Sequence, residues 1–280
     1  MITVEMLGGL GNQMFRYAAG RSLAEKVGTG LVLDLSHFAG YKLRNFELDI
    51  FRIKAEIRQS SGILAKIGTI TSKLKSAQKK YREKHFHFDA DFFDLPDGTY
   101  LRGDFQSEKY FFPVKDLIRR NFTFAGELNN DSKKYLALIR NAKLPVSIHF
   151  RITDYLKSEQ KDQYHYVLPG EYYRQSIFLL SRRLLKPVYF IFSDDLNYVK
   201  MNYDLPVNAV FIDREVKTES WEDMRLMSLC RHHIIANSTF SWWAAWLNSY
   251  TKKVIISPLR WFDNNPSDTG DLIPETWVKI

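Results

Sequence analysis

The chain has 280 residues, of which 45% are hydrophobic and 15% aromatic, and this supply of core-forming side chains excludes a disordered protein. A single cysteine, Cys230, excludes a disulfide framework and any thiolate-based zinc site. The formal net charge is +8, and residues 52–84 alone carry ten Lys or Arg against two Glu, so the excess is concentrated in one segment.

The N-terminal half begins with a pattern typical of a Rossmann-like domain. A β-branched run at 2–7 predicts a strand, which leads through a glycine turn into a helix that ends near Val27. Further strands are expected at 31–35 and 100–105. Strands alternating with helices indicate an α/β fold with a parallel sheet.

The glycine turn "GGLGNQMF" (8–15) is the first candidate binding site. Glycines allow backbone amides to approach a phosphate closely at a helix N-terminus. We therefore expect Gly9, Gly11 and Asn12 to contact a phosphorylated ligand.

The basic segment 52–84 contains an apolar stripe at helical spacing, formed by Ile63, Ile67, Ile70 and Leu74. One interpretation is a solvated surface helix, and the other is a helix that adheres to an anionic membrane surface. A nucleic-acid surface is disfavoured, because the segment lacks interleaved aromatic residues and no nucleic-acid motif accompanies it.

The stretch "HFHFDADFFD" (85–94) offers the metal-ligand types His85, His87, Asp89 and Asp91. An alternating strand with the phenylalanines at 86 and 88 pointing inward, followed by a capped turn, explains the same pattern. We favour the strand and expect no metal site.

The C-terminal half predicts a second doubly wound sheet. Its expected strands are 146–151, 188–193, 209–213, 232–237 and 253–258, and its expected helices are 170–185, 220–230 and 240–248. Right-handed crossovers between such strands give a Rossmann-like domain. A charged stretch before Pro145 suggests the hinge, so the predicted domains are 1–142 and 143–280.

Polar side chains follow three of these strands at the edge where doubly wound domains bind ligands. They are His149, Arg151 and Asp154 after the first strand, Ser193 and Asp194 after the second, and Asn237, Ser238, Thr239 and Ser241 after the fourth. Hydroxyls at a helix N-terminus suit a diphosphate, which Arg151 would clamp bidentately. Ordinary N-capping is the alternative, although three hydroxyls exceed what a cap requires.

The aromatic run after this loop has two interpretations. Trp242, Trp243 and Trp246 would stack on a sugar ring or pack in the core, and helical spacing beside a strand favours the core. Cys230 lies on an apolar helix and is expected to be an inert core residue.

Taken together, the motifs resemble the bacterial α-1,2-fucosyltransferases of glycosyltransferase family 11. The residues that carry the resemblance are "GGLGNQMF" (8–15), "NFELDIF" (45–51), "YLRGDFQSEKYF" (100–111), "HFRITDY" (149–155), "FSDD" (192–195) and "NSTFSWWAAWLN" (237–248). The resemblance implies a GT-B fold, with two Rossmann-like domains and the active site in the cleft between them. It further implies metal-independent, inverting transfer of L-fucose from GDP-L-fucose to the 2-hydroxyl of a galactose.

The resemblance also implies roles for residues. His149, Arg151 and Asp154 match the His, first Arg and Asp of a His-x-Arg-Arg-x-Asp signature, whereas Ile152 stands at the second Arg and Thr153 at a usual Gly. Arg151 would then contact the β-phosphate and His149 would lie near the nucleotide. Asp154 is the candidate general base, with orientation of Arg151 as its alternative role. Residues 1–142 become the acceptor-side domain and 143–280 the nucleotide-sugar-binding domain.

Two other function classes remain open. Gly9-x-Gly11, with Asp34 at the end of the next strand, imitates the fingerprint of an NAD-dependent oxidoreductase or sugar epimerase, although Met14 occupies the third glycine position. A non-catalytic nucleotide or sugar binder is the second class, since Ile152 replaces an arginine.

The cellular setting follows from what the N-terminus and the hydropathy pattern lack. An early Glu5 without a long apolar core predicts no signal peptide, and no run is long enough to span a bilayer. We therefore expect a cytoplasmic enzyme acting on lipid-linked polysaccharide precursors, with 52–84 contacting the membrane as a further hypothesis.

Overall fold

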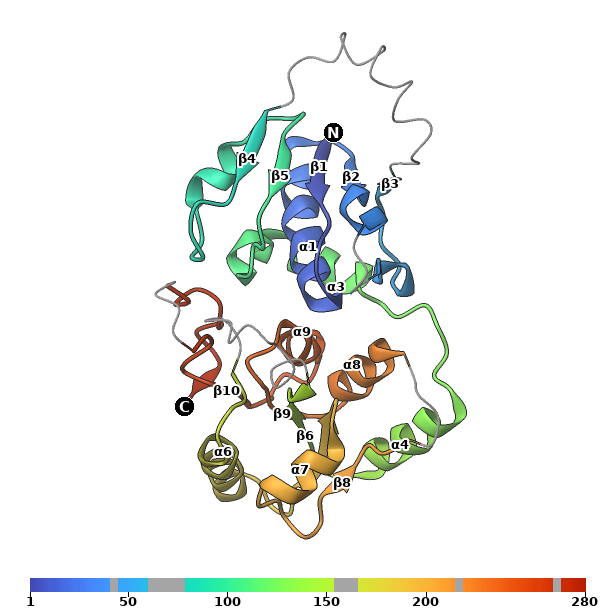
Figure 1. The fold of residues 1–280 in the computed structure, drawn as a ribbon, viewed down its shortest axis with the longest axis vertical. Helices are drawn as coiled ribbons and strands as arrows, with labels where there is room; N and C mark the ends of the chain where they lie inside the picture. Colours follow the sequence, from blue (N-terminus) through green and yellow to red (C-terminus); the bar gives the residue numbers. More distant parts are fainter. Residues whose placement is uncertain (41–44, 60–78, 154–165, 215–218, 264–267) are drawn as a thin grey trace. The chain divides into compact units, whose positions relative to one another are not determined.

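The computed structural model describes residues 1–40, 45–59, 79–153, 166–214, 219–263 and 268–280 (Figure 1). Its strands are β1 (Ile2–Glu5), β2 (Leu31–Asp34), β3 (Glu56–Arg58), β4 (Lys80–Arg82), β5 (Tyr100–Arg102), β6 (Pro145–Phe150), β7 (Val188–Ser193), β8 (Val210–Phe211), β9 (His232–Ile234), β10 (Ile255–Ser257) and β11 (Val278–Lys279). Its α-helices are α1 (Leu10–Val27), α3 (Lys115–Asn121), α4 (Asn130–Asn141), α6 (Gly170–Arg183), α7 (Leu196–Asn202), α8 (Ser220–Ser228) and α9 (Thr239–Leu247). Short 3-10 helices are η1 (Ser36–Gly40), η2 (Leu48–Ile50), η4 (Ala90–Asp94), η5 (Glu108–Tyr110) and η6 (Phe112–Val114). None of the helices in these ranges combines the length and apolar character needed to cross a membrane.

The chain divides into two compact units. Unit 1 comprises Met1–Ala125 and Ser267–Pro274, and unit 2 comprises Gly126–Pro266 and Glu275–Ile280. The sequence-based boundary at 142 differs from this division, because α4 contacts α8 and therefore belongs to unit 2. A segment near the C-terminus also returns to unit 1, which no local pattern in the sequence indicates.

Unit 1 is built on a parallel sheet with the order β3-β2-β1-β5-β4. The central strand β1 is buried along its whole length, as expected for a strand covered on both faces. Helix α1 packs closely on the sheet (Figure 1), since a Cβ at Gly20 would lie 2.2 Å from a Val4 methyl carbon. The helix ends at Gly28, whose φ of +67° is a left-handed cap that favours glycine.

Unit 2 is built on a parallel sheet with the order β11-β10-β9-β6-β7-β8. Counted from its first strand, this is the order 3-2-1-4-5-6 of dinucleotide-binding domains. The strand order reverses between β6 and β9, and ligands of this fold bind beyond the carboxyl ends of the strands at that position. The predicted doubly wound α/β fold is confirmed in both units.

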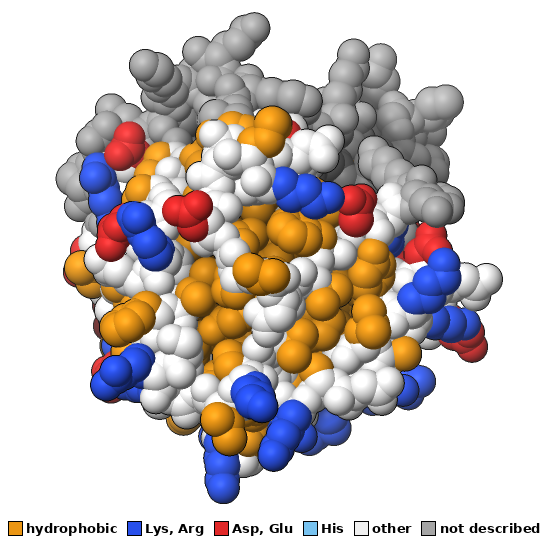
Figure 2. Space-filling view, turned by 90° about the horizontal axis from the view of Figure 1, so that it is seen from below, with side chains coloured by type: hydrophobic (Ala, Val, Ile, Leu, Met, Phe, Trp, Pro, Cys, Tyr) orange, Lys and Arg blue, Asp and Glu red, His pale blue; other side chains and the backbone are white. Residues whose placement is uncertain are grey.

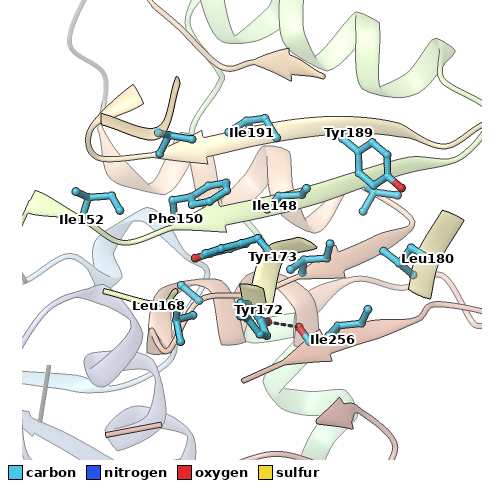
Figure 3. Close-up of a cluster of buried hydrophobic side chains, with 14 residues drawn as sticks. Ile148, Phe150, Ile152, Leu168, Tyr172, Tyr173, Leu180, Tyr189, Ile191 and Ile256 are labelled. Carbon is cyan, nitrogen blue, oxygen red and sulfur yellow. Dashed lines mark hydrogen bonds between the residues drawn. The ribbon is translucent and has the colours of Figure 1, made fainter. Parts of the chain in front are cut away.

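The core of unit 2 lies between β6 and α6 (Figure 3). Phe150 stacks on Tyr173 with ring centroids 4.0 Å apart, and the Tyr172 hydroxyl donates to the carbonyls of Ile235 (2.6 Å) and Ile256 (3.2 Å). Satisfying this hydroxyl lets a tyrosine occupy a core position without an unpaired polar group. Helix α6 is thereby fixed to three strands of the sheet.

One face of the molecule, at the end where α6, α7 and β8 lie in Figure 1, gathers hydrophobic side chains with Lys and Arg at its edge (Figure 2). Exposed hydrophobic residues of these elements and their loops are Phe178, Leu185, Met201 and Val207. Leu185 precedes β7 and Val207 precedes β8, so both lie at the amino ends of the strands. None of the predicted site residues that the structure describes lies at this edge of the sheet.

Several predictions on single elements have clear outcomes. Trp242 and Trp243 are fully buried, Trp246 is 5% exposed, and Cys230 is buried, so the core interpretation is confirmed. The strand expected at 85–88 is wrong, because residues 85–87 form bends and residue 88 is irregular. The capped turn is confirmed, since the Asp89 carboxylate accepts from the amide of Asp91 at 3.1 Å. The amphipathic helix expected over 63–74 lies outside the described residues.

A buried histidine ties β9 to its neighbours. His233 Nε2 accepts from the Asn248 side-chain amide at 2.7 Å, so its Nδ1 carries the proton of the neutral ring and donates to Ser147 Oγ at 2.7 Å. Burial, together with the nearby charge of Lys253, lowers the pKa of His233 to about 3. The neutral ring is therefore part of the folded structure at pH 7.

His233 is expected to make folding acid-sensitive. Its pKa is depressed in the folded state, so the unfolded chain takes up the proton first and stability falls as the pH drops below about 6.5. Between pH 7 and 5 the wild-type protein should lose about 2 kcal/mol more stability than His233→Gln, measured by urea unfolding at both pH values. Equal losses in the two proteins would contradict this assignment.

Candidate functional site

The carboxyl ends of β6, β7 and β9 meet at one edge of the unit 2 sheet. The register pairs Phe150 with Ser193 on one side of β6 and Ile148 with Ile234 on the other. The residues that follow these strands are therefore neighbours, although they are far apart in the sequence. This edge brings together the predicted residues His149, Arg151, Ser193 and Asp194 and the loop 237–241.

Asp194 organises the loop after β6. Its Oδ1 accepts from the amide of Ile152 at 2.8 Å, and its Oδ2 accepts from the amide of Thr153 at 3.1 Å. The same Oδ2 lies 3.5 Å from Arg151 Nη1, and both side chains are about three-quarters buried. The Asp194 carboxylate therefore holds both the arginine and the loop that carries it.

Three serine hydroxyls lie at this edge of the sheet, and they differ in where their hydroxyl hydrogens point. Ser238 caps the helix by accepting from the amide of Phe240 at 3.3 Å, which leaves its own hydroxyl hydrogen available to a ligand. Ser193 is similar, since its Oγ accepts from the amide of Asp195 at 3.0 Å. The buried Ser241 hydroxyl instead directs its hydrogen to the carbonyls of Ala236 (3.4 Å) and Ser238 (3.2 Å).

Asn237 fixes this loop to two others. Its side-chain amide donates to the carbonyls of Tyr166 and Trp261, both at 3.2 Å, and the residue is 5% exposed. Thr239 is the first residue of α9 and is partly exposed. The predicted loop thus combines an amide that shapes it with a helix N-terminus that is open to a ligand.

His149 is neutral at this edge. Burial, and to a smaller degree the charge of Arg151, lowers the pKa of His149 to about 3. Its ring lies 5.7 Å from that of Phe240 on α9, and its Nδ1 has no hydrogen-bond partner within the described part of the chain. A neutral imidazole here does not add positive charge but does offer a polar nitrogen to a ligand.

Ile152 occupies a core position. It is 1% exposed and packs in the hydrophobic cluster with Phe150 and Leu168 (Figure 3). Its side chain points into unit 2, so the replacement of the signature's second Arg is compatible with the packing. Asp154, the predicted general base, lies outside the described residues.

The arrangement at this edge suits an anionic group. Arg151 supplies a guanidinium, and the N-terminus of α9 supplies the partial positive charge of a helix dipole. A carboxylate already bonded to the loop, Asp194, keeps the guanidinium in place. These elements together match the recognition of a phosphate or diphosphate.

The glycine turn belongs to unit 1. Gly8 has φ +81°, in the region that favours glycine, and Gly9 is the N-cap of α1. Gly11 and Asn12 lie in the first turn of the helix, and Asn12 Oδ1 accepts from the Gln106 side chain at 3.4 Å. The turn is thus a helix N-terminus of the kind predicted.

The sequence-based reasoning missed a charged cluster at the carboxyl edge of the unit 1 sheet. Glu5 is 4% exposed and lies near Arg102 Nε (2.9 Å), Arg16 Nη1 (3.7 Å) and His37 Nε2 (2.8 Å). Glu83 follows β4 and binds backbone amides of the turn after β5. The signal was present for Glu5, a carboxylate in an apolar strand, but Glu83 was hidden in the basic segment.

The side chains considered as metal ligands make other contacts in the structure. The rings of His85 and His87 stack with centroids 3.5 Å apart, and Asp89 accepts from the Tyr81 hydroxyl at 2.9 Å. Within the described ranges no three His, Cys, Asp or Glu side chains gather as ligands of one metal ion.

Comparison with known proteins adds three findings. A family model described as "Glycosyl transferase family 11" matches residues 1–280. An alpha-1,2-colitosyltransferase of Escherichia coli is 31% identical over 292 residues, covering 100% of this chain and 99% of that one. The human galactoside alpha-(1,2)-fucosyltransferase 1 is 26% identical over 256 residues, covering 88% of this chain and 65% of that one.

A solved structure confirms the fold. A mutant of Arabidopsis thaliana FUT1 in complex with GDP superposes with a TM-score of 0.52 at 13% identity, covering 95% of this chain and 72% of that one. Two parallel α/β units of this kind are the GT-B architecture, as predicted.

Proposed function

Because the chain belongs to glycosyl transferase family 11, we propose that it is an inverting transferase that moves L-fucose from GDP-L-fucose to the 2-hydroxyl of a galactose. The acceptor would be a lipid-linked precursor of O-antigen or another surface polysaccharide. The names of its relatives support the α-1,2 linkage and a galactoside acceptor, and the FUT1 complex supports GDP as the nucleotide. Family membership also favours a transferase over the NAD-dependent alternative.

One observation carries the proposal. The strand order of unit 2 reverses between β6 and β9, and the residues after these two strands are Arg151 and the N-terminus of α9. A guanidinium and a helix N-terminus at the switch point of a doubly wound sheet are suited to the diphosphate of a sugar nucleotide. We therefore assign donor binding to unit 2 and acceptor binding to unit 1. In the glycine turn of unit 1, Gly9, Gly11 and Asn12 are proposed to contact a phosphate group.

The proposed reaction is a single displacement. A bond forms between the acceptor oxygen and the anomeric carbon, and the bond from that carbon to the β-phosphate oxygen breaks, so negative charge develops on the departing GDP. Arg151 and the positive end of the α9 helix dipole would stabilise that charge without a metal. The hydroxyl hydrogens of Ser193 and Ser238 remain available, and these groups would donate hydrogen bonds to the sugar nucleotide.

The acceptor hydroxyl must also lose its proton. Because Asp194 already pairs with Arg151, orientation of the arginine does not require Asp154. We therefore assign proton acceptance to Asp154 and positioning of Arg151 to Asp194. The neutral His149 ring cannot stabilise negative charge on the departing GDP, so we propose only that it contacts the nucleotide.

A second donor is favoured by a specific observation. The colitosyltransferase matches this chain over its full length at 31% identity. Colitose is fucose without its 3-hydroxyl, so a site that hydrogen-bonds this hydroxyl would reject colitose, and one that packs apolar atoms there would accept it. The second candidate is therefore transfer of colitose in the same linkage.

Calorimetric titration in EDTA, with GDP, UDP and NAD in turn, tests the nucleotide. Selective binding of GDP in the micromolar range is expected. EDTA should not abolish it, because protein groups and not a metal ion would hold the diphosphate. Assays with GDP-fucose and GDP-colitose and a galactosyl acceptor would then separate the two donors. Preference for UDP or NAD would refute both, and GDP binding without transfer from either donor would leave a non-catalytic binder.

A further inference from the structure

Glu83 binds two successive backbone amides of another segment. Its Oε2 accepts from the amide of Asp104 at 2.7 Å and from that of Phe105 at 3.2 Å, and its Oε1 accepts from Phe105 at 3.1 Å. Glu83 comes directly after β4, and the turn that it contacts comes directly after β5. One carboxylate thus bridges the carboxyl ends of two neighbouring strands.

The turn that Glu83 binds has an unfavourable backbone conformation. Phe105 has φ +51°, in the left-handed region that residues with a side chain rarely adopt. Its ring is fully buried between Phe92 and Tyr110, with centroids 5.6 and 5.4 Å away. Packing fixes the ring, and the carboxylate fixes the amide, so the conformation is held from both sides.

Gly103 makes the close approach possible. A Cβ at this position would lie 2.5 Å from Glu83 Cβ and 2.8 Å from Glu83 Oε2, which is closer than such atoms pack. A side chain at 103 would therefore displace the carboxylate from the turn. The contact between Glu83 and the turn therefore depends on the glycine at 103.

The same turn is tied to the first two turns of α1. Asp104 accepts from Arg16 Nη2 at 2.7 Å, and the Gln106 side chain donates to Asn12 Oδ1 at 3.4 Å. Asn12 belongs to the glycine turn 8–15, which we assign to a phosphorylated ligand. A movement of the turn after β5 would therefore reach a proposed ligand contact.

We propose that Glu83 is a positioning residue for sugar transfer, whose carboxylate fixes the turn 103–106 and through it the place of Gln106 and Asn12. This inference rests on the proposed function, because the importance of the turn follows from the ligand assigned to the glycine loop. Glu83 itself is not required to touch a substrate.

Ionisation of Glu83 should be visible near neutral pH. Burial raises the pKa of Glu83 to about 7, the amides of Phe105 and Asp104 and the charge of Arg16 oppose the rise, and the charge of Asp104 adds to it. The tyrosines that face it, Tyr81 and Tyr110, remain protonated, since burial is the main cause that raises the pKa of each. Because an ionised carboxylate is the stronger acceptor for backbone amides, the turn is held best above pH 7.

The pH dependence of transfer in Glu83→Gln tests the inference. Wild-type kcat/KM is expected to rise about tenfold between pH 6 and 8, whereas Glu83→Gln should be flat over that range and about tenfold below wild type at pH 8. The matched control Glu275→Gln, at an exposed carboxyl in unit 2, should follow the wild type. A wild-type profile in Glu83→Gln would overturn the inference.

Amide hydrogen exchange provides a measurement that does not depend on the reaction. Protection factors of the Asp104 and Phe105 amides should fall from pH 8 to pH 6 in the wild type and be low at both pH values in Glu83→Gln, while amides of unit 2 remain protected. Unchanged protection would refute the contact. If the wild type transfers neither fucose nor colitose, the proposed function fails, and the exchange result still decides whether Glu83 holds the turn.

Discussion

Replacing Arg151 with Ala is expected to lower kcat/KM by about a hundredfold to a thousandfold, as the loss of a group that stabilises developing charge does in other enzymes. Arg151 follows β6 at the switch point of the unit 2 sheet, and its Nη1 lies 3.5 Å from Asp194 Oδ2. Without Arg151, Asp194 still accepts from the amides of Ile152 and Thr153, so the cost to folding should be small beside the loss of transfer. The loss would therefore appear in transfer kinetics and in GDP affinity rather than in the unfolding transition.

Two further variants, Arg151→Lys and Arg174→Ala, serve as controls for Arg151→Ala. Arg151→Lys keeps one positive charge but loses the planar fork, so it should recover part of the rate. Arg174→Ala removes an arginine of the same unit that is 61% exposed and pairs with Glu171 on the surface of α6, and it should leave the rate unchanged. Wild-type kcat/KM in Arg151→Ala would refute the assigned role and the diphosphate site with it.

The second large effect is expected in unit 1. Arg16→Leu should destabilise the protein by about 3 kcal/mol or more, because it leaves the buried Glu5 carboxylate without one of its cations. Arg16 is itself 5% exposed and donates to the Glu5 carbonyl at 3.0 Å and to Asp104 at 2.7 Å. Urea unfolding at pH 7 measures the loss.

Variants at the same cluster separate the buried pair from its surroundings. Arg102→Gln removes a cation that is 53% exposed and should cost below about 1 kcal/mol. The double variant Glu5→Gln/Arg16→Leu should be more stable than Arg16→Leu alone, because it also removes the buried carboxylate that has lost its buried cation. If the double variant is the less stable of the two, the loss of a buried cation beside Glu5 is not the cause.

Strands buried on both faces were predictable from the sequence. β6 and β7 are rich in β-branched and aromatic residues, and their predicted ranges agree with the structure to within one residue. The edge strands of unit 1 were not, because β3 has three exposed residues and β4 buries only Tyr81, which leaves no period for pattern analysis. The return of 267–274 to unit 1 depends on tertiary contacts, including the Phe88 amide donating to Asp271 at 3.0 Å.

The candidate site was predictable as a set of strand ends, but the task of each side chain was not. Arg151 and the α9 N-terminus were found from residue type and position. That Asp194 binds the amides of Ile152 and Thr153, and that Ser241 donates to backbone carbonyls, depends on neighbours brought close by folding. The same holds for His149, whose residue type suggests a titrating group but whose burial keeps it neutral.

The interleaved course of the chain determines how parts of such a protein can be exchanged between relatives. Unit 1 includes Ser267–Pro274, and the next residues return to unit 2, where β11 completes the edge of the sheet beside β10. A chimera joined once, near residue 125, would combine one parent's sheet with the other parent's closing segment. Donor and acceptor preferences should therefore transfer cleanly between parents only in chimeras with three junctions, which carry the short segment along with the sheet it packs on.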